Sequence, residues 1–277
     1  MTFIDLILNL AGLLLWLKWW EKESEITGPR ISLLGTLKKT GPRHPRIWFF
    51  IALLALLIVR PILCWSLGSA SDWVPRLWFG VIPLSFRSDF FWISFLFSFL
   101  SFGAALMIFY TSLLLLSILN NKRSEAGPIQ SLIREQLGKL DLLPAFLKLL
   151  LPWLVMIALW CLFNKPLVTL GVLPAPKSFL HVVEQGAIAG LGIYLTWKYL
   201  IVAILLLHLL NSYIYFGPSA VWTFIDNSAQ KLLKAISWIP LRLWKFDLAA
   251  PLAMILVIVA AKYSSRGLVL LFQQLLF

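Results

Sequence analysis

Side chains that could bind a metal ion or act as catalysts are sparse in this 277-residue chain. The three histidines, His44, His181 and His208, stand far apart, and none forms a His-x-x-His or Glu-x-x-His pair. The two cysteines, Cys64 and Cys161, form no Cys-x-x-Cys motif, so the chain alone does not offer a thiolate zinc site. Glycine-rich phosphate loops and a nucleophile elbow are also absent from the sequence. These residues predict a protein that is not an enzyme and that carries no metal ion or cofactor.

Several titratable residues nevertheless fall inside apolar segments, among them His208, Arg60 and Lys148. His208 is placed deepest, and Asn211 and Ser212 follow at spacings that put all three side chains on one side of a helix. The simplest interpretation is an interhelical hydrogen bond. A proton relay and an axial haem ligand are the alternatives, but the sequence places no acidic residue beside His208. Arg60 and Lys148 lie nearer to segment ends, and we expect both to extend their charged groups toward the membrane surface.

The composition explains why these groups stand in apolar surroundings. Apolar residues make up 60% of the chain and charged residues only 13%, whereas a soluble domain has roughly 45–50% apolar and about 25% charged residues. The chain therefore predicts an all-α integral membrane protein, because each span needs about 20 mostly apolar residues. We expect spans near residues 3–20, 47–66, 89–119, 143–163, 184–214 and 248–262, with an apolar tail at 267–277.

Positive charge is distributed unevenly among the connections between these spans. Fourteen lysines and arginines fall in the first, third and fifth connections, and four fall in the second and fourth. Because cytoplasmic loops are enriched in Lys and Arg, we expect the odd connections to be cytoplasmic and both termini to lie outside. A cleaved signal peptide is the alternative for the first span. That span carries its positive charge, Lys18, after its apolar run, which is the opposite of the order in a signal peptide.

A Gly-Pro pair recurs in each odd connection. The pairs are Gly28-Pro29, Gly127-Pro128 and Gly217-Pro218, at spacings of 99 and 90 residues. A fixed period of this kind predicts an internal repeat, and we expect three parallel two-helix hairpins. The predicted divisions are a first hairpin at 1–66, an external aromatic-rich connection at 67–88, a second hairpin at 89–163, an external loop at 164–183, and a third hairpin with the apolar tail at 184–277.

Amphipathic segments follow the second and third Gly-Pro pairs. Apolar residues recur at helical spacing from Ile129 to Leu140 and from Val221 to Ile236. We expect interfacial helices on the cytoplasmic side that bury their apolar faces at the lipid headgroups. The alternative is that these faces pack on the protein itself. The basic residues expected to bind anionic headgroups are Arg30, Lys38, Lys39, Arg43, Arg46, Arg134, Lys139, Lys231, Lys234 and Arg242.

Two of the later spans open with an aspartate followed by a proline, namely Asp141 with Pro144 and Asp247 with Pro251. Asp can cap the free N–H groups of a helix, and Pro is tolerated in a first turn. The order of a span, a basic amphipathic segment with Pro and Arg, an Asp-Leu pair with a nearby Pro, and another span resembles the YggT family. The resemblance covers roughly residues 90–262, and the N-terminal hairpin departs from the two hairpins that the family typically has.

The resemblance implies a multi-pass protein of the bacterial inner membrane, linked to complex assembly, haem-protein maturation, membrane organisation or osmotic tolerance. It implies no enzyme activity. A small-residue surface around Gly186 and Gly190 predicts a close helix contact, either within the fold or between chains. The expected partners are membrane lipids and other integral membrane subunits or further copies of the chain, and not nucleic acid.

The sequence therefore predicts a scaffold, an assembly factor or a small subunit of a larger membrane complex. A channel or transporter concerned with ions or osmotic balance is the alternative, although few deep polar residues are present to line a water path. A cofactor-binding membrane subunit is a third alternative, and it would need ligands that the chain hardly provides.

Overall fold

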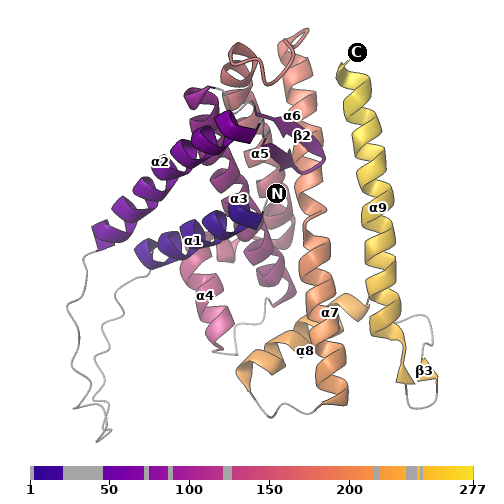
Figure 1. Cartoon of the computed structure of the whole chain (residues 1–277). Coiled ribbons are helices and arrows are strands. Elements are labelled where there is room, and N and C mark those ends of the chain that lie inside the picture. Colours follow the sequence, from indigo (N-terminus) through magenta and orange to yellow (C-terminus); the bar gives the residue numbers. More distant parts are fainter. Residues whose placement is uncertain are drawn as a thin grey trace, which may run out of the picture. The chain divides into compact units, whose positions relative to one another are not determined.

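The computed structural model describes residues 3–20, 46–71, 75–86, 90–120, 127–214, 217, 219–234, 242–243 and 246–276. Most of these residues are helical (Figure 1). Within this part of the chain, six helical segments are long and apolar enough to cross a membrane. The prediction of a helical multi-pass membrane protein is confirmed. The chain forms two compact units, one of Met1–Trp73 with Arg87–Phe102 and one of Val74–Phe86 with Gly103–Phe277.

The first unit contains an antiparallel helix pair. Helices α1 (Phe3–Trp20) and α2 (Arg46–Ser71) pack together, and the Trp19 and Phe50 rings meet with centroids 4.9 Å apart. The helices match the first two predicted spans, because most residues of both segments are apolar. Helix α3 (Phe91–Leu119) contributes its first part, as far as Phe102, to this unit and the remainder to the second.

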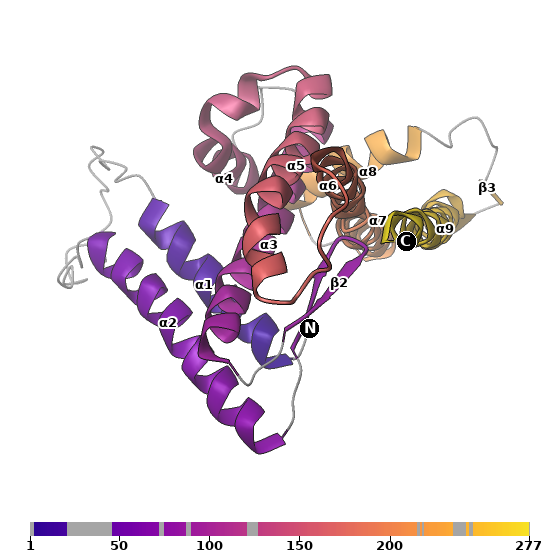
Figure 2. The same ribbon diagram turned by 90° about the horizontal axis from the view of Figure 1, so that it is seen from above.

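The second unit is built around longer helices. Helix α5 (Ala145–Thr169) packs along α6 (Phe179–Tyr194), and α9 (Ala249–Leu276) runs beside α6 and α7 (Trp197–Tyr213) (Figures 1 and 2). Helices α6 and α7 follow one another through a short turn and together form a candidate span of 35 residues. At about 1.5 Å per residue this span exceeds the roughly 30 Å of a bilayer core. Helix α9 continues through the segment predicted as a separate apolar tail, so that division is wrong.

Two short amphipathic helices connect the long ones, as predicted. Helix α4 (Pro128–Leu137) begins after Gly127 and continues into the 3₁₀ turn η1 (Gly138–Leu142), and α8 (Ala220–Leu233) follows Gly217. Their apolar faces pack on the protein itself. Side chains of α4 and α8 join α3 in one cluster, and α8 joins α7 and α9 in another. The buried part of each apolar face therefore packs on the long helices, as the alternative interpretation predicts. Leu132 and Leu140 remain exposed, and contact of these helices with lipid headgroups stays a prediction.

Two small antiparallel ribbons were not predicted. Strands β1 (Arg76–Phe79) and β2 (Ile82–Ser85) form a hairpin with Gly80 in its turn at φ +60°. A Cβ atom on Gly80 would lie 2.7 Å from the backbone of Gly192 in α6, so the turn and the helix meet through two glycines. The alternation of Leu77 and Leu84, both buried, with exposed neighbours was the available signal. A shorter ribbon joins β3 (Arg242–Leu243) to β4 (Phe246–Asp247) before α9.

Candidate functional site: a buried arginine cluster

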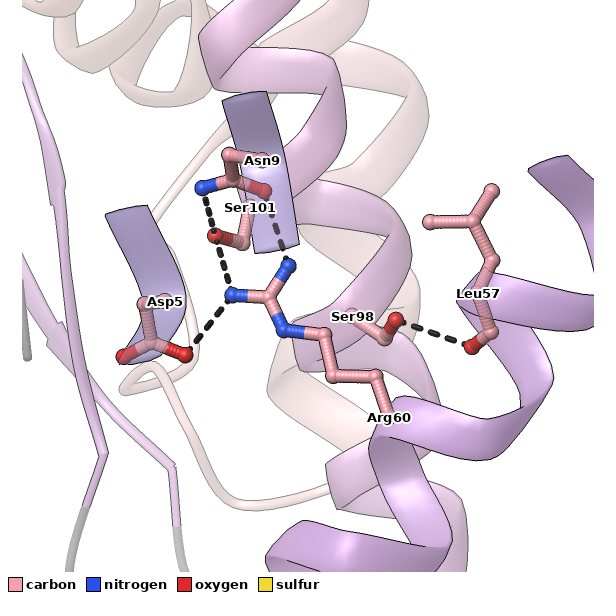
Figure 3. Close-up of polar contacts among 6 residues, drawn as sticks. All are labelled: Asp5, Asn9, Leu57, Arg60, Ser98 and Ser101. Carbon is pink, nitrogen blue, oxygen red and sulfur yellow. Dashed lines mark hydrogen bonds and ion pairs between the residues drawn. The ribbon is translucent and has the colours of Figure 1, made fainter. Parts of the chain in front are cut away.

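The guanidinium of Arg60, on α2, is a buried charge in the first unit (Figure 3). Its Nη2 donates to Asp5 Oδ1 at 2.8 Å and to Ser101 Oγ at 2.9 Å, and its Nη1 donates to Asn9 Oδ1 at 2.8 Å. Asn9 in turn donates from Nδ2 to the same Ser101 Oγ at 3.0 Å. The cluster therefore joins three helices, α1, α2 and α3, through one cation.

Helical spacing places each partner. Asp5 and Asn9 are four residues apart on α1, so they lie one turn apart on the same face. Three serines at positions 94, 98 and 101 follow the same rule on α3, and each is buried. Ser98 Oγ donates to the carbonyl oxygen of Leu57 on α2 at 2.9 Å, which fixes α2 against α3 beside the arginine.

The site is almost entirely removed from solvent. Arg60 is 2% exposed and Asp5 3% exposed. The Arg60 Cζ atom also lies 5.1 Å from the centroid of the Phe97 ring, a distance at which a cation is attracted to an aromatic face. A charge buried to this extent is tolerated when it is paired and hydrogen-bonded. Asp5 therefore balances the charge, and Asn9, Ser101 and Phe97 complete the surroundings.

The expectation that Arg60 extends to the membrane surface is wrong. Its stem is enclosed by α1 and α3, and an aspartate within reach makes burial of the charge favourable. Arg60 Nε has no hydrogen-bond partner among the described residues. Because a guanidinium does not release its proton in proteins, the cluster is suited to holding helices together and not to passing protons along.

A second charged cluster lies in the second unit, where α3, η1 and α5 meet. Lys148 Nζ donates to Ser117 Oγ at 2.7 Å and lies 3.6 Å from Asp141 Oδ1, and Ser117 Oγ donates to the same carboxylate oxygen at 2.5 Å. Lys148 is 2% exposed, so the prediction that it reaches the membrane surface is also wrong. A polar cavity of about 60 Å³ adjoins Ser117 and Asp141, and Arg134 also lines it.

The prediction that Asp141 caps a helix is also wrong. Helix α5 begins at Ala145 with Pro144 at its N-cap, and no side chain caps it. Asp141 lies within η1, where its carboxylate pairs with Lys148 and accepts a hydrogen bond from Ser117 instead of capping free helix N–H groups. Pro251 stands in the first turn of α9, as predicted, and Asp247 belongs to the strand β4 that precedes this helix.

The carboxyl end of α3 is closed by side chains from two amphipathic helices. Lys231 Nζ of α8 donates to the carbonyl oxygen of Leu119. Asn120 Nδ2 donates to Ser228 Oγ at 2.6 Å, and Gln130 Nε2 of α4 donates to the Asn120 carbonyl oxygen at 3.4 Å. A helix end carries unpaired carbonyl groups and a partial negative charge, so a lysine there is favourable. Lys231, predicted to bind lipid headgroups, thus binds within the protein.

His208 has an acidic partner that sequence reasoning missed. Its Nδ1 lies 2.8 Å from Asp226 Oδ1 on α8, and Asn211 Nδ2 donates to Asp226 Oδ2 at 2.8 Å. The predicted interhelical hydrogen bond is present, with Asp226 supplying the acceptor. Ser212, predicted on the same face, instead donates to the carbonyl oxygen of Leu209 in its own helix. No group of three or more His, Cys, Asp or Glu residues that could hold a metal ion occurs among the described residues.

The remaining predicted residues are placed as follows. Gly186 and Gly190 of α6 lie against α5, where a Cβ atom would meet Trp160 and Ile157 at 3.1 and 3.2 Å and Trp153 at 2.7 Å, so this contact is within the chain. Gly127 precedes α4, with Pro128 in its first turn. Arg46, Arg134, Lys139 and Lys234 are exposed. Gly28, Pro29, Arg30, Lys38, Lys39, Arg43, Pro218 and the Arg242 side chain lie outside the described residues.

The two cysteines are free thiols, with Cys64 buried in the first unit and Cys161 partly buried in the second. Comparison of the chain with protein-family models, with curated proteins and with solved structures gives no match.

Proposed function

We propose that this protein is a non-catalytic subunit of a larger membrane complex, acting as a scaffold or assembly factor, and that it is related to the YggT family. The observation that carries the proposal is the pairing of the buried charges. Arg60 is held by Asp5, and Lys148 by Asp141, each with a serine of α3 as a further partner. Charges arranged in this way hold neighbouring helices of the same chain against one another.

The same pairing argues against a transport path through these clusters. An ion or proton relay needs groups that exchange partners, whereas the buried guanidinium of Arg60 is hydrogen-bonded to α1 and α3. The polar cavity beside Asp141 has a volume of about 60 Å³, which has room for a few water molecules. Such a cavity supports a local hydrated site more readily than a continuous channel.

The outward faces of the helices indicate the class of partner. Large apolar residues are exposed along the long helices, among them Ile51, Ile58 and Ile62 on α2 and Ile255 and Val259 on α9. In a membrane these faces meet lipid chains or other transmembrane helices, which associate through close packing. Other integral membrane subunits and further copies of this chain are therefore the partners that fit.

A channel or transporter is the second candidate. The observation in its favour is the intramembrane position of the charged groups, since ionisable residues inside spans often mark ion or proton pathways. The two candidates make different demands on the Asp5–Arg60 pair. A transporter needs these charges for activity, whereas a scaffold needs only the helix packing that they support.

The test compares the wild-type chain with the double variant Asp5→Leu/Arg60→Met. Both are expressed at native levels, extracted into native nanodiscs, and analysed for stoichiometric partner subunits, and both are reconstituted into liposomes for ion-flux measurements. We expect a constant partner in both preparations and no flux from either. Flux from the wild-type chain that disappears in the double variant, without a stoichiometric partner, would overturn the scaffold proposal. The variant Ser98→Ala, which leaves both charges in place, is the matched control.

A further inference from the structure

An apolar groove in the second unit has no occupant within the described chain. It lies between α3, the α4–η1 segment and α5, and its volume is about 300 Å³. Met107 and Leu114 of α3, Leu137 and Leu140 of α4 and η1, and Leu151 and Val155 of α5 form its walls. This volume is at the lower end of the range of about 300–1,000 Å³ that small-molecule sites occupy.

The groove offers almost nothing to a polar ligand. Two wall residues, Tyr110 and Thr111, carry hydroxyl groups. Thr111 donates its hydroxyl to carbonyl groups of its own helix at 2.8 and 3.0 Å. Its carbonyl oxygen accepts a hydrogen bond from Trp197 Nε1 at 3.2 Å. Pro152, also in the wall, has no backbone N–H to donate. The occupant that fits this lining is a hydrocarbon chain.

The groove is long enough for part of one acyl chain. Along α3 its lining runs from Met107 to Leu114, a distance of about 10 Å at 1.5 Å per residue. Half of the roughly 30 Å hydrocarbon core is about 15 Å. Leu140 of η1 also lines the groove, and the next residue, Asp141, contacts Ser117 near the end of α3. An acyl chain entering beside η1 would therefore place part of its length in the groove.

A lysine next to Leu140 favours an anionic headgroup. Lys139 immediately precedes Leu140 and is exposed, whereas Arg134 lines the polar cavity beside Asp141 and not the groove. Asp141, the acidic residue that follows Leu140, is contacted by Lys148 and Ser117. Basic sites between transmembrane helices at a membrane surface bind anionic lipid headgroups. We propose that the groove binds an anionic phospholipid, with one acyl chain between α3 and α5 and its phosphate beside Lys139.

The test uses a photoactivatable phosphatidylglycerol with a diazirine midway along one acyl chain. The full chain is reconstituted into phosphatidylcholine nanodiscs with a trace of this probe, and the labelled peptides are identified by mass spectrometry. A phosphatidylcholine probe with the same diazirine is measured in parallel. We expect the phosphatidylglycerol probe to label α3 and α5 around Met107 and Val155 in preference to the exposed face of α9.

Two tryptophan variants distinguish the groove from the general lipid surface. Val155→Trp places a large ring in the groove, whereas Leu154→Trp adds the same ring beside it, at a residue that does not line the groove. Both positions are partly exposed, at 37% and 48%, so neither substitution fills a closed core. We expect Val155→Trp to reduce phosphatidylglycerol labelling of the groove at least fivefold and Leu154→Trp to leave it unchanged.

Lys139→Gln tests the headgroup, and because Lys139 is exposed this variant should fold normally. We expect phosphatidylglycerol labelling to fall about fivefold, the factor that one basic residue contributes near a membrane surface, while phosphatidylcholine labelling stays constant. Equal labelling by both lipids in the wild-type chain would overturn the anionic preference. Equal effects of the two tryptophan variants, or groove residues that cross-link to a second polypeptide and not to lipid, would overturn the lipid site itself.

Discussion

The Asp5–Arg60 ion pair predicts a strong energetic coupling between α1 and α2. We consider the single variants Asp5→Leu and Arg60→Met and the double variant that combines them. Asp5→Leu removes the counter-charge of a guanidinium that is 2% exposed, and Arg60→Met removes a cation that lies 2.8 Å from a carboxylate that is 3% exposed. Breaking a buried pair by removing one partner costs about 3–5 kcal/mol, because the remaining charge stays buried and uncompensated.

The double variant should be less damaging than either single variant. Removing both charges also removes the desolvation penalty, and replacement of a buried pair by apolar residues is often neutral. Asn9 and Ser101 lose the arginine but keep their hydrogen bond to each other at 3.0 Å. We therefore expect the double variant to lie within about 2 kcal/mol of the wild type, with a coupling energy of at least about 3 kcal/mol between the two positions.

The assay is reversible unfolding in mixed detergent and SDS micelles, followed by fluorescence or circular dichroism. A matched control combines Asp5→Leu with Asp226→Ala, because Asp226 lies in the other compact unit, where it contacts His208 and Asn211. This pair should be additive within about 0.5 kcal/mol. If the Asp5→Leu/Arg60→Met variant instead loses the sum of its two single effects, the ion pair does not link the helices and the reasoning is refuted.

Three further changes test other contacts. Gly80→Ala should destabilise by about 2 kcal/mol more than Gly171→Ala in thermal unfolding, because both have positive φ but only Gly80 meets neighbouring backbone; equal losses would contradict the close contact. Asp226→Ala should lower the free energy of unfolding by about 1–3 kcal/mol and speed hydrogen exchange in α8, because it removes the contacts to His208 and Asn211. The control Gln230→Ala, at an exposed position of the same helix, should change neither quantity. Unchanged exchange in Asp226→Ala would show that these contacts do not hold α8. A cysteine introduced by Thr36→Cys should react with an impermeant reagent only after the cells are opened, because the first connection is rich in Lys and Arg and is expected to be cytoplasmic. Labelling in intact cells would show that the orientation is the opposite.

The helical spans could be predicted because their signal is local. An apolar run of about 20 residues allows few structures other than a transmembrane helix, and α1 begins and ends where its run does. The amphipathic helices α4 and α8 were also visible in the period of their apolar residues. The helical period does not indicate which surface covers the apolar face, because lipid and protein can both bury it. The side chains of α3, α7 and α9 decided that question.

The polar contacts could not be predicted in the same way, because each joins residues far apart in the sequence. Arg60 meets Asp5, which is 55 residues away, and a lone arginine near a helix end is equally compatible with a position at the membrane surface. Local spacing held part of the answer. Asp5 and Asn9 share one face of α1, and the buried serines of α3 share another, so polar stripes on apolar helices marked the surfaces that meet. The partner of His208 lay on the polar face of an amphipathic helix, where an aspartate ordinarily suggests exposure to water.

The two buried cations share one arrangement, and α3 explains it. In each cluster the cation lies beside an aspartate and donates a hydrogen bond to a serine of α3, which is Ser101 for Arg60 and Ser117 for Lys148. Helix α3 itself carries no charged residue between Phe91 and Leu119. A serine without another partner can donate its hydroxyl to a carbonyl group of its own helix, so it is compatible with an apolar helix in the bilayer. The charges stand on neighbouring helices that bring their own counter-charges. Helix α3 therefore supplies neutral hydrogen-bonding groups to both cations without carrying a charge itself.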